Sequence, residues 1–331
     1  MTETAAHLRD ERLGEPMRIL VTGAAGYVGR AVVHDLLAHG AEVVALVHEH
    51  VPDLPDGVET RHADLTDRAA TSAAVHGTHG VCHLAGLARA RLRSRPPARY
   101  HAVNVTGTAH LLDALATETE RTGRPANLVF ASTSSVYGRP THHPVDEAVP
   151  RDPLHPYAAT KAEAEDLISS RVATGALRAT TLRILNAAGA SAGRADQDLT
   201  RIIPRAVAVA TRPTSPLDVN GDGTAVRDFV HVRDVAAAFT RALRANSPGR
   251  QAVYNLGAHP ASVRDVVESV ERLTGRPLPL RHRPAVAQEA RMLIADTTAI
   301  RTALGWTPTT EGLDDLVHDQ WRTAQRAEAT P

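Results

Sequence analysis

The chain has 331 residues, and its 37 basic and 37 acidic side chains give a formal net charge of zero. This balance gives no sign of a nucleic-acid-binding surface. No apolar run reaches the roughly 20 residues that a membrane helix needs, so we expect no membrane contact. Residues 1–16 lack the apolar core of a signal peptide, and we expect them to form a flexible arm of a cytoplasmic protein.

A chain of this length exceeds what one hydrophobic core usually organises, which predicts a large domain with a smaller one. Cys82 is the only cysteine and lies in the apolar run 80–85, which predicts a buried thiol without a disulfide partner in the chain. The 18 histidines show no spacing typical of metal ligands, so we expect no metal site.

A strand, a glycine-rich turn and a helix are predicted in succession from residue 17. Residues 17–22 are apolar, as in a strand that is buried on both faces, and Gly23, Gly26 and Gly29 come next. Apolar residues then repeat at helical spacing as far as Gly40. Glycines allow a tight turn and a close backbone approach to a pyrophosphate, whose charge the start of the helix stabilises. The segment therefore predicts a dinucleotide-binding turn.

Apolar strands alternate with helical stretches, which predicts an α/β fold with a doubly wound parallel sheet. The expected strands after the first are residues 42–47, 58–63, 80–85, 127–132 and 179–185. Ligands of such sheets bind at the carboxyl ends of strands, where Asp64 and the hydroxyl residues 132–135 lie. Asp64 is either an adenine contact or the N-cap of the next helix. The hydroxyl cluster is either a ligand site or a polar turn.

Tyr157 and Lys161 form the most informative pair in the chain. Lys161 is the only lysine among the 37 basic residues, and it lies one helical turn after Tyr157, so both side chains share a face. Arginine is too broad to replace a compact ammonium beside a phenol and a ribose. A positive charge about 5 Å from the phenol, at an effective dielectric of about 20, lowers its pKa by about two units. We therefore expect Lys161 to lower the pKa of Tyr157 and make it a base near neutral pH.

With these motifs, the chain resembles the extended short-chain dehydrogenase/reductases that act on nucleotide sugars, in particular the UDP-glucose (UDP-galactose) 4-epimerase branch. The likeness covers nearly the whole chain and rests on ordered motifs at residues 22–29, 64–65, 83–87, 104–108, 133–138, 157–161, 182–186, 226–232 and 254–257. It implies a Rossmann domain of residues 17–185, joined by residues 228–257, and a smaller substrate-binding domain of residues 186–227 and 258–331. It also implies a homodimer joined through helices in residues 104–120 and 157–172.

By position, the resemblance implies that Tyr157 is the acid/base, that Lys161 holds the nicotinamide ribose and that Thr133 hydrogen-bonds the sugar oxygen that is oxidised. The cofactor contacts that it implies are Gly23, Gly26, Tyr27, Val28, Gly29, His48, Asp64, Leu65, Leu84, Ala85, Gly86, Asn104, Tyr157, Lys161 and Leu185. The substrate contacts that it implies are Thr133, Ser134, Ser135, Asn186 and Arg227, with Arg283 as a shifted substitute for an arginine that relatives carry before residue 292. Which nucleotide and which sugar are bound stays open.

Two departures from the family pattern bear on the reaction. Related 4,6-dehydratases place an Asp-Glu pair after the catalytic threonine, where this chain has Ser134 and Ser135, so dehydration is disfavoured. Val47 stands where NAD-selective relatives carry a carboxylate, with His48 next, which weakens the selection against NADP.

The function that the resemblance implies is a nucleotide-sugar 4-epimerase with tightly bound NAD. Such an enzyme acts on a nucleotide-diphosphate sugar, here a UDP-hexose, through transient oxidation at the sugar C4. An NADPH-dependent 4-ketoreductase of a nucleotide-linked keto-sugar and a non-catalytic dinucleotide sensor are the alternatives.

Overall fold

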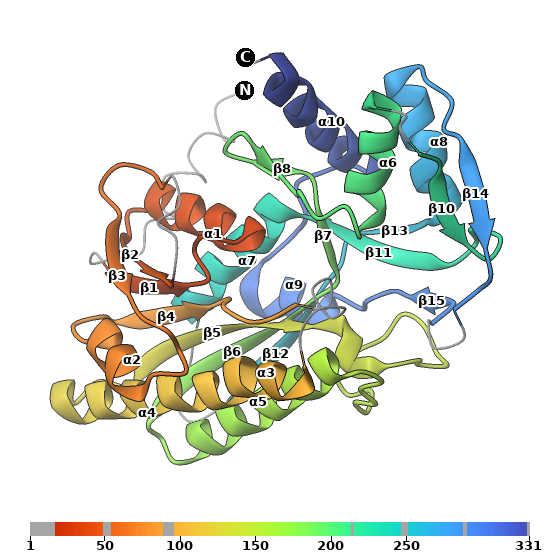
Figure 1. The fold of residues 1–331 in the computed structure, drawn as a ribbon. Helices are drawn as coiled ribbons and strands as arrows, with labels where there is room; N and C mark the ends of the chain where they lie inside the picture. Colours follow the sequence, from red (N-terminus) through yellow and green to blue (C-terminus); the bar gives the residue numbers. More distant parts are fainter. Residues whose placement is uncertain are drawn as a thin grey trace, which may run out of the picture.

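The computed structural model describes residues 17–48, 54–88, 96–212, 215–245, 251–286 and 290–329. The arm predicted for residues 1–16 lies outside these residues. Figure 1 shows a large sheet with helices on both faces and, beside it, a smaller group of strands and helices that includes the C-terminal helix.

Within the described residues, the large sheet has seven strands, all parallel, in the order β12-β6-β5-β4-β1-β2-β3. Their bounds are β1 Arg18–Thr22, β2 Glu42–Val47, β3 Glu59–His62, β4 Gly80–His83, β5 Ala126–Thr133, β6 Leu177–Ile184 and β12 Gln251–Leu256. The predicted doubly wound parallel sheet is therefore confirmed. Its winding direction reverses between β4 and β1, which is where sheets of this kind bind their ligands.

Helices cover both faces of this sheet (Figure 1). One face carries α1 (Tyr27–Ala38), α7 (Val232–Ala245) and α9 (Thr298–Leu304), and the other carries α2 (Arg68–Val75), α3 (Pro97–His101), α4 (Gly107–Thr122) and α5 (Pro156–Ala173). Each layer has its own apolar core, with Leu36 and Phe239 on the first side and Phe130 and Ile168 on the second. Full burial of one such side chain stabilises the fold by roughly 1.5–3 kcal/mol. Cys82 is buried in the first core, which confirms the predicted buried thiol.

The smaller group of elements is built around a second sheet and a core of its own. The sheet contains β7 (Asn186–Ala188), β11 (Val226–His231), β13 (His259–Ser262) and β15 (Met292–Leu293), and two short pairs join β8 (Ala190–Ser191) to β9 (Arg194–Ala195) and β10 (Leu217–Asn220) to β14 (Leu280–Arg283). Helices α6 (Ile202–Thr211), α8 (Val263–Thr274) and α10 (Leu313–Ala329) bury Ile203, Val266 and Leu316 against it. No helix in the described part of the chain has the length and apolar character to cross a bilayer.

Candidate active site

Glycines shape the turn between β1 and α1, and a larger residue at Gly23 or Gly29 would displace neighbouring backbone atoms. Gly23 has a φ of +70°, and a Cβ there would lie 2.7 Å from the backbone nitrogen of Ala85. A Cβ on Gly29 would lie 2.1 Å from the carbonyl oxygen of Gly23. The N-cap of α1 is Gly26, which places no side chain on the first N–H groups of the helix. These N–H groups and the positive end of the helix dipole fit the pyrophosphate of a dinucleotide.

The two other predicted contacts in this turn face the body of the protein. The Tyr27 hydroxyl donates a hydrogen bond of 2.8 Å to the carbonyl oxygen of Gly189, between β7 and β8. Val28 packs against the core beneath α1. Both side chains thus hold the turn in place. Their backbone N–H groups lie at the start of α1, where a helix offers unpaired N–H groups to an anion.

The segment after β4 lies against the glycine turn and extends to α5. Ala85 donates its N–H to the Thr22 hydroxyl at 3.1 Å, and Leu84 donates its N–H to the Thr22 carbonyl at 3.2 Å. A Cβ on Gly86 would lie 3.0 Å from Oδ1 of Asn104 and 3.6 Å from Nζ of Lys161. The fold therefore brings together predicted cofactor contacts from the segment after β4, from the π-helical segment Ala102–Thr106 before α4 and from α5.

The expected adenosine end of the site lies at the carboxyl ends of β2 and β3. Nε2 of His48 lies 3.1 Å from Oδ2 of Asp64, and Asp64 also accepts the N–H of Thr66 at 2.9 Å. The N-cap of α2 is Asp67, which accepts the N–H of Ala70 at 3.0 Å. The alternative of Asp64 as the helix cap is therefore wrong.

Two residues near Asp64 are buried: Val47, which ends β2, and Leu65, which follows Asp64 in the sequence. Val47 is 2% exposed and closes β2 without a carboxylate. Leu65 is 5% exposed, and its carbonyl oxygen lies 3.0 Å from Nδ1 of His110. Among the predicted cofactor contacts at this edge, His48 and Asp64 carry ionisable side chains, and both are partly exposed.

Tyr157 and Thr133 meet at the carboxyl end of β5. Thr133 ends this strand, Tyr157 lies in the first turn of α5, and the Thr133 hydroxyl lies near enough to the phenol to influence its pKa. Burial raises the pKa of Tyr157, while the Thr133 hydroxyl and the Arg201 guanidinium lower it. The expectation that Lys161 lowers the pKa of this phenol is thus wrong for the structure described. The sequence does not give the extent of burial, which decides the direction.

Lys161 is buried one helical turn further along α5. It is 5% exposed, and its Nζ lies 4.4 Å from the centroid of the Phe130 ring, a cation–π contact. Burial lowers the pKa of Lys161 to about 8, and the carboxylate of Glu165 opposes this effect. The ammonium therefore lies beside Gly86 and Asn104, where a ribose bound against the glycine turn would meet it.

The hydroxyl residues after β5 form a short 3-10 helix, Ser134–Tyr137, which Thr133 caps by accepting the N–H of Ser135 at 3.2 Å. Ser134 and Leu185 line one hollow, together with Leu293, Ile294 and Ala295 from the region of β15. The strand end thus faces the smaller group of elements.

The predicted phosphate-binding residues lie on the second sheet. The side-chain amide of Asn186 donates to the carbonyl oxygen of Asp228 at 2.9 Å, and Arg227 precedes Asp228 on β11. Arg283 lies elsewhere, on the exposed strand β14, where it forms an ion pair of 3.2 Å with Asp218. The structure therefore places Asn186 beside the strand that carries Arg227. Arg283 instead pairs with the carboxylate of Asp218.

Two features near the site were not predicted from the sequence. Arg201 is the N-cap of α6 and forms an ion pair of 3.1 Å with Asp196, and its charge acts on Tyr157. Glu165 and Arg183 form a buried ion pair of 2.7 Å behind the catalytic strand end. The spacing of apolar residues predicts neither feature, because both depend on how elements that are far apart in the sequence pack against each other.

Comparisons with known proteins agree with this geometry. The sequence profile of the NAD dependent epimerase/dehydratase family matches residues 19–257. A UDP-glucose 4-epimerase of Corynebacterium glutamicum is 35% identical over 92% of this chain and 95% of its own length.

Two solved structures share the fold over nearly their whole length. A UDP-glucose-4-epimerase from Stenotrophomonas maltophila, with bound NAD and formylated UDP-arabinopyranose, has a TM-score of 0.85 and 29% identity, covering 95% of this chain and 100% of that one. A UDP-glucose 4-epimerase from Bifidobacterium longum, in complex with NAD+ and UDP, has a TM-score of 0.83 and 26% identity, covering 94% and 99%. The glycine turn, the Tyr157–Thr133 pair and these likenesses lead to one conclusion: the chain belongs to the NAD dependent epimerase/dehydratase family.

Proposed function

We propose that this protein is a nucleotide-sugar 4-epimerase that uses NAD and interconverts two UDP-hexoses differing in configuration at C4. The observation that carries the proposal is the placement of Tyr157 and Thr133 near Lys161, at the edge of the sheet that carries the glycine turn. The relatives named above are UDP-glucose 4-epimerases, and the two solved ones hold NAD with UDP or a UDP-sugar derivative. This agreement between site and relatives supports the substrate class.

In this proposal the residues of the site divide the work of proton transfer and binding. Tyr157 removes the proton of the sugar 4-hydroxyl and later returns it, while Thr133 hydrogen-bonds the same oxygen. NAD would be held by the glycine turn and Lys161, and it would supply the hydride chemistry at C4 that permits return to either face of the sugar. Lys161, as an ammonium, holds the nicotinamide ribose through its N–H donors.

The remaining assignments concern binding and organisation. We propose that Asn186 and Arg227 bind the diphosphate, since a guanidinium binds phosphate oxygens in pairs. The dinucleotide is then held by residues 17–185 with residues 228–257, and the sugar by residues 186–227 and 258–331. Arg283 as a further substrate contact and a cytoplasmic location stay predictions from the sequence.

A homodimer through α4 and α5 is part of the proposal. The two helices are long and lie side by side on one face of the sheet (Figure 1). Light scattering on the purified protein measures its mass in solution. A mass of twice the 35.3 kDa chain supports the dimer, and a single-chain mass contradicts it.

The reaction is tested without any added reductant. We expect UDP-glucose and UDP-galactose to interconvert, and we expect the product formed from C4-deuterated substrate to retain its deuterium, because the hydride returns to the carbon that it left. Chromatography and mass spectrometry of the sugar nucleotides measure both outcomes. If no 4-epimeric UDP-hexose pair interconverts while a 4-keto-sugar consumes NADPH stoichiometrically, the protein is a reductase and the proposal is wrong.

A further inference from the structure

A buried carboxylate lies one helical turn beyond the catalytic lysine. Tyr157, Lys161 and Glu165 follow one another at intervals of four on α5, so they share one face of the helix. Glu165 is 4% exposed. It accepts hydrogen bonds from Nη2 and Nε of Arg183 at 2.7 and 3.2 Å, and a third from the hydroxyl of Ser132. Ser132 directly precedes Thr133 on β5, so this carboxylate contacts the catalytic strand end from behind.

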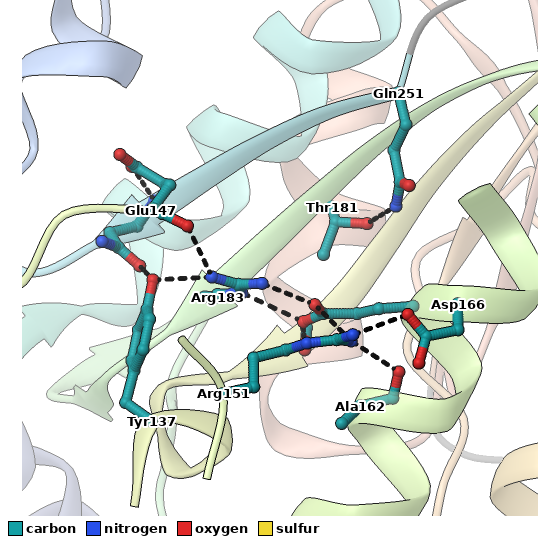
Figure 2. Close-up of polar contacts among 11 residues, drawn as sticks. Tyr137, Glu147, Arg151, Ala162, Asp166, Thr181, Arg183 and Gln251 are labelled. Atoms are coloured by element: carbon teal, nitrogen blue, oxygen red, sulfur yellow. Dashed lines mark hydrogen bonds and ion pairs between the residues drawn. The ribbon is translucent and has the colours of Figure 1, made fainter. Parts of the chain in front are cut away.

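Arg183 is itself held in place from the other side. It is 6% exposed on β6, and its Nη1 donates to the Tyr137 hydroxyl at 2.8 Å and to the Glu147 carbonyl at 3.3 Å. The Tyr137 hydroxyl donates in turn to Oδ1 of Asn255 at 2.8 Å. Figure 2 shows Arg183 between Tyr137 and the region of Arg151 and Ala162. With both sides engaged, the guanidinium fixes the Glu165 carboxylate in one position.

The surroundings of Lys161 are poor in charge apart from Glu165. On β5, Lys161 meets the Phe130 ring, which lies two residues before Ser132 and therefore on the same face of the strand. On β4, His83 is fully buried, and burial lowers its pKa to about 3, so it is neutral at physiological pH. The neutral side chain of Asn104 lies beside Gly86, and the Tyr157 phenol is one turn back on the same helix.

Burial and the carboxylate act on Lys161 in opposite directions. Burial in this apolar surrounding disfavours the ammonium and lowers the pKa of Lys161 to about 8, while the negative charge of Glu165 raises it. Beyond Glu165, Arg151 forms ion pairs of 3.4 Å with Glu165 and 2.6 Å with the exposed Asp166. Glu165 is thus the buried negative charge nearest to the lysine along the helix.

We propose that Glu165 is a positioning residue for Lys161: its carboxylate, fixed by Arg183 and Ser132, supplies the negative charge that keeps the buried lysine an ammonium. A neutral lysine would offer one lone pair and two N–H groups in place of three N–H donors and a positive charge. The role goes beyond the proposed reaction, since it concerns the charge of the lysine whichever sugar is bound.

The sequence makes this charge directly observable. Lys161 is the only lysine, so protein grown with lysine labelled by carbon-13 at Cε gives a single lysine resonance, whose pH titration reports Lys161 alone. We expect a midpoint near 8 in the unaltered protein and a midpoint lower by about one pH unit or more in Glu165→Gln, because a nearby unit charge is lost. Asp166→Asn is the matched control: it removes the same charge one residue further along, from a side chain that is 65% exposed, and the midpoint should not move.

Two further variants separate charge from packing. Glu165→Gln leaves Arg183 buried without its partner, which destabilises a fold, whereas removing both charges is tolerated better. The double variant Glu165→Gln with Arg183→Gln should therefore fold, as circular dichroism measures, and should show the lowered midpoint. Arg183→Gln alone keeps the carboxylate, and its midpoint should not fall.

The titration needs no substrate, so its outcome is independent of the epimerase assay. A midpoint that stays in place in Glu165→Gln and in the double variant overturns the proposal. So does an equal fall in Arg183→Gln, because the effect would then follow packing rather than the negative charge.

Discussion

The Thr133 hydroxyl acts on the phenol of Tyr157 and lowers its pKa, although one residue ends a strand and the other lies in the first turn of a helix. Two neighbouring hydroxyls can share the oxygen of one sugar hydroxyl, one as the proton acceptor and the other as a hydrogen-bond partner. Because burial raises the pKa of Tyr157, the phenol is protonated at neutral pH unless a positive charge favours the phenolate.

Tyr157→Phe removes this hydroxyl and almost no volume. We expect the fold and NAD binding to persist while turnover falls by roughly 10² or more, because the proton acceptor is gone. Steady-state kinetics measure the loss, and mass spectrometry of denatured protein measures the retained NAD. Turnover close to that of the unaltered enzyme would exclude Tyr157 as the base.

Lys161→Arg keeps the positive charge and changes its shape. We expect most activity to be lost and NAD to bind more weakly, because the planar guanidinium does not fit the buried space between Phe130 and Gly86. Lys161→Met is the matched control without charge, and the two variants should be about equally impaired. A fully active arginine variant would show that charge alone is required.

Gly29→Ala tests the glycine turn. A Cβ at this position would lie 2.1 Å from the Gly23 carbonyl oxygen, so α1 and the turn must separate and the pyrophosphate loses its N–H donors. We expect at least a tenfold loss of NAD affinity by calorimetry, on the order of 1.4 kcal/mol or more. Gly312→Ala is the control, since a Cβ there meets no atom within 4 Å. Equal NAD affinity in both variants would contradict the predicted pyrophosphate site.

His48→Asp tests cofactor choice at the end of β2. A carboxylate there repels the 2′-phosphate of NADP, so we expect the affinity for NADP to fall about tenfold more than the affinity for NAD. His76→Asp makes the same charge change on a side chain that is 67% exposed at the C-cap of α2, near the opposite edge of the sheet, and serves as the control. Calorimetric titration with both cofactors measures the ratio. Parallel losses for NAD and NADP would place the adenosine ribose elsewhere.

Features that depend on neighbouring residues could be predicted from the sequence. The turn at Gly23 and the burial of the strand before it follow from local backbone sterics and from an apolar run. The choice between Asp64 and Asp67 as the cap of α2 could not be predicted, because both are good N-caps and the direction of the chain after β3 decides between them.

Features that depend on how distant elements pack against each other could not be predicted from the sequence. The pair of Glu165 and Arg183 joins a helix to a strand, and each residue alone is typical of a solvated charge. The pKa of Tyr157 has the same origin: the sequence predicted that Lys161 would lower it, but burial raises it, and burial comes from tertiary packing.

The edge strand β12 limits how this chain can be divided. All six of its residues pair with β6, yet it follows α6 and β11 in the sequence. A truncated gene that stops after α6 would leave the N–H and C=O groups of β6 as an open row at the sheet margin, a template for pairing with a second copy. The large sheet and the smaller group of elements are therefore interleaved in the sequence, and exchanging either one with a relative requires at least three cuts in the chain.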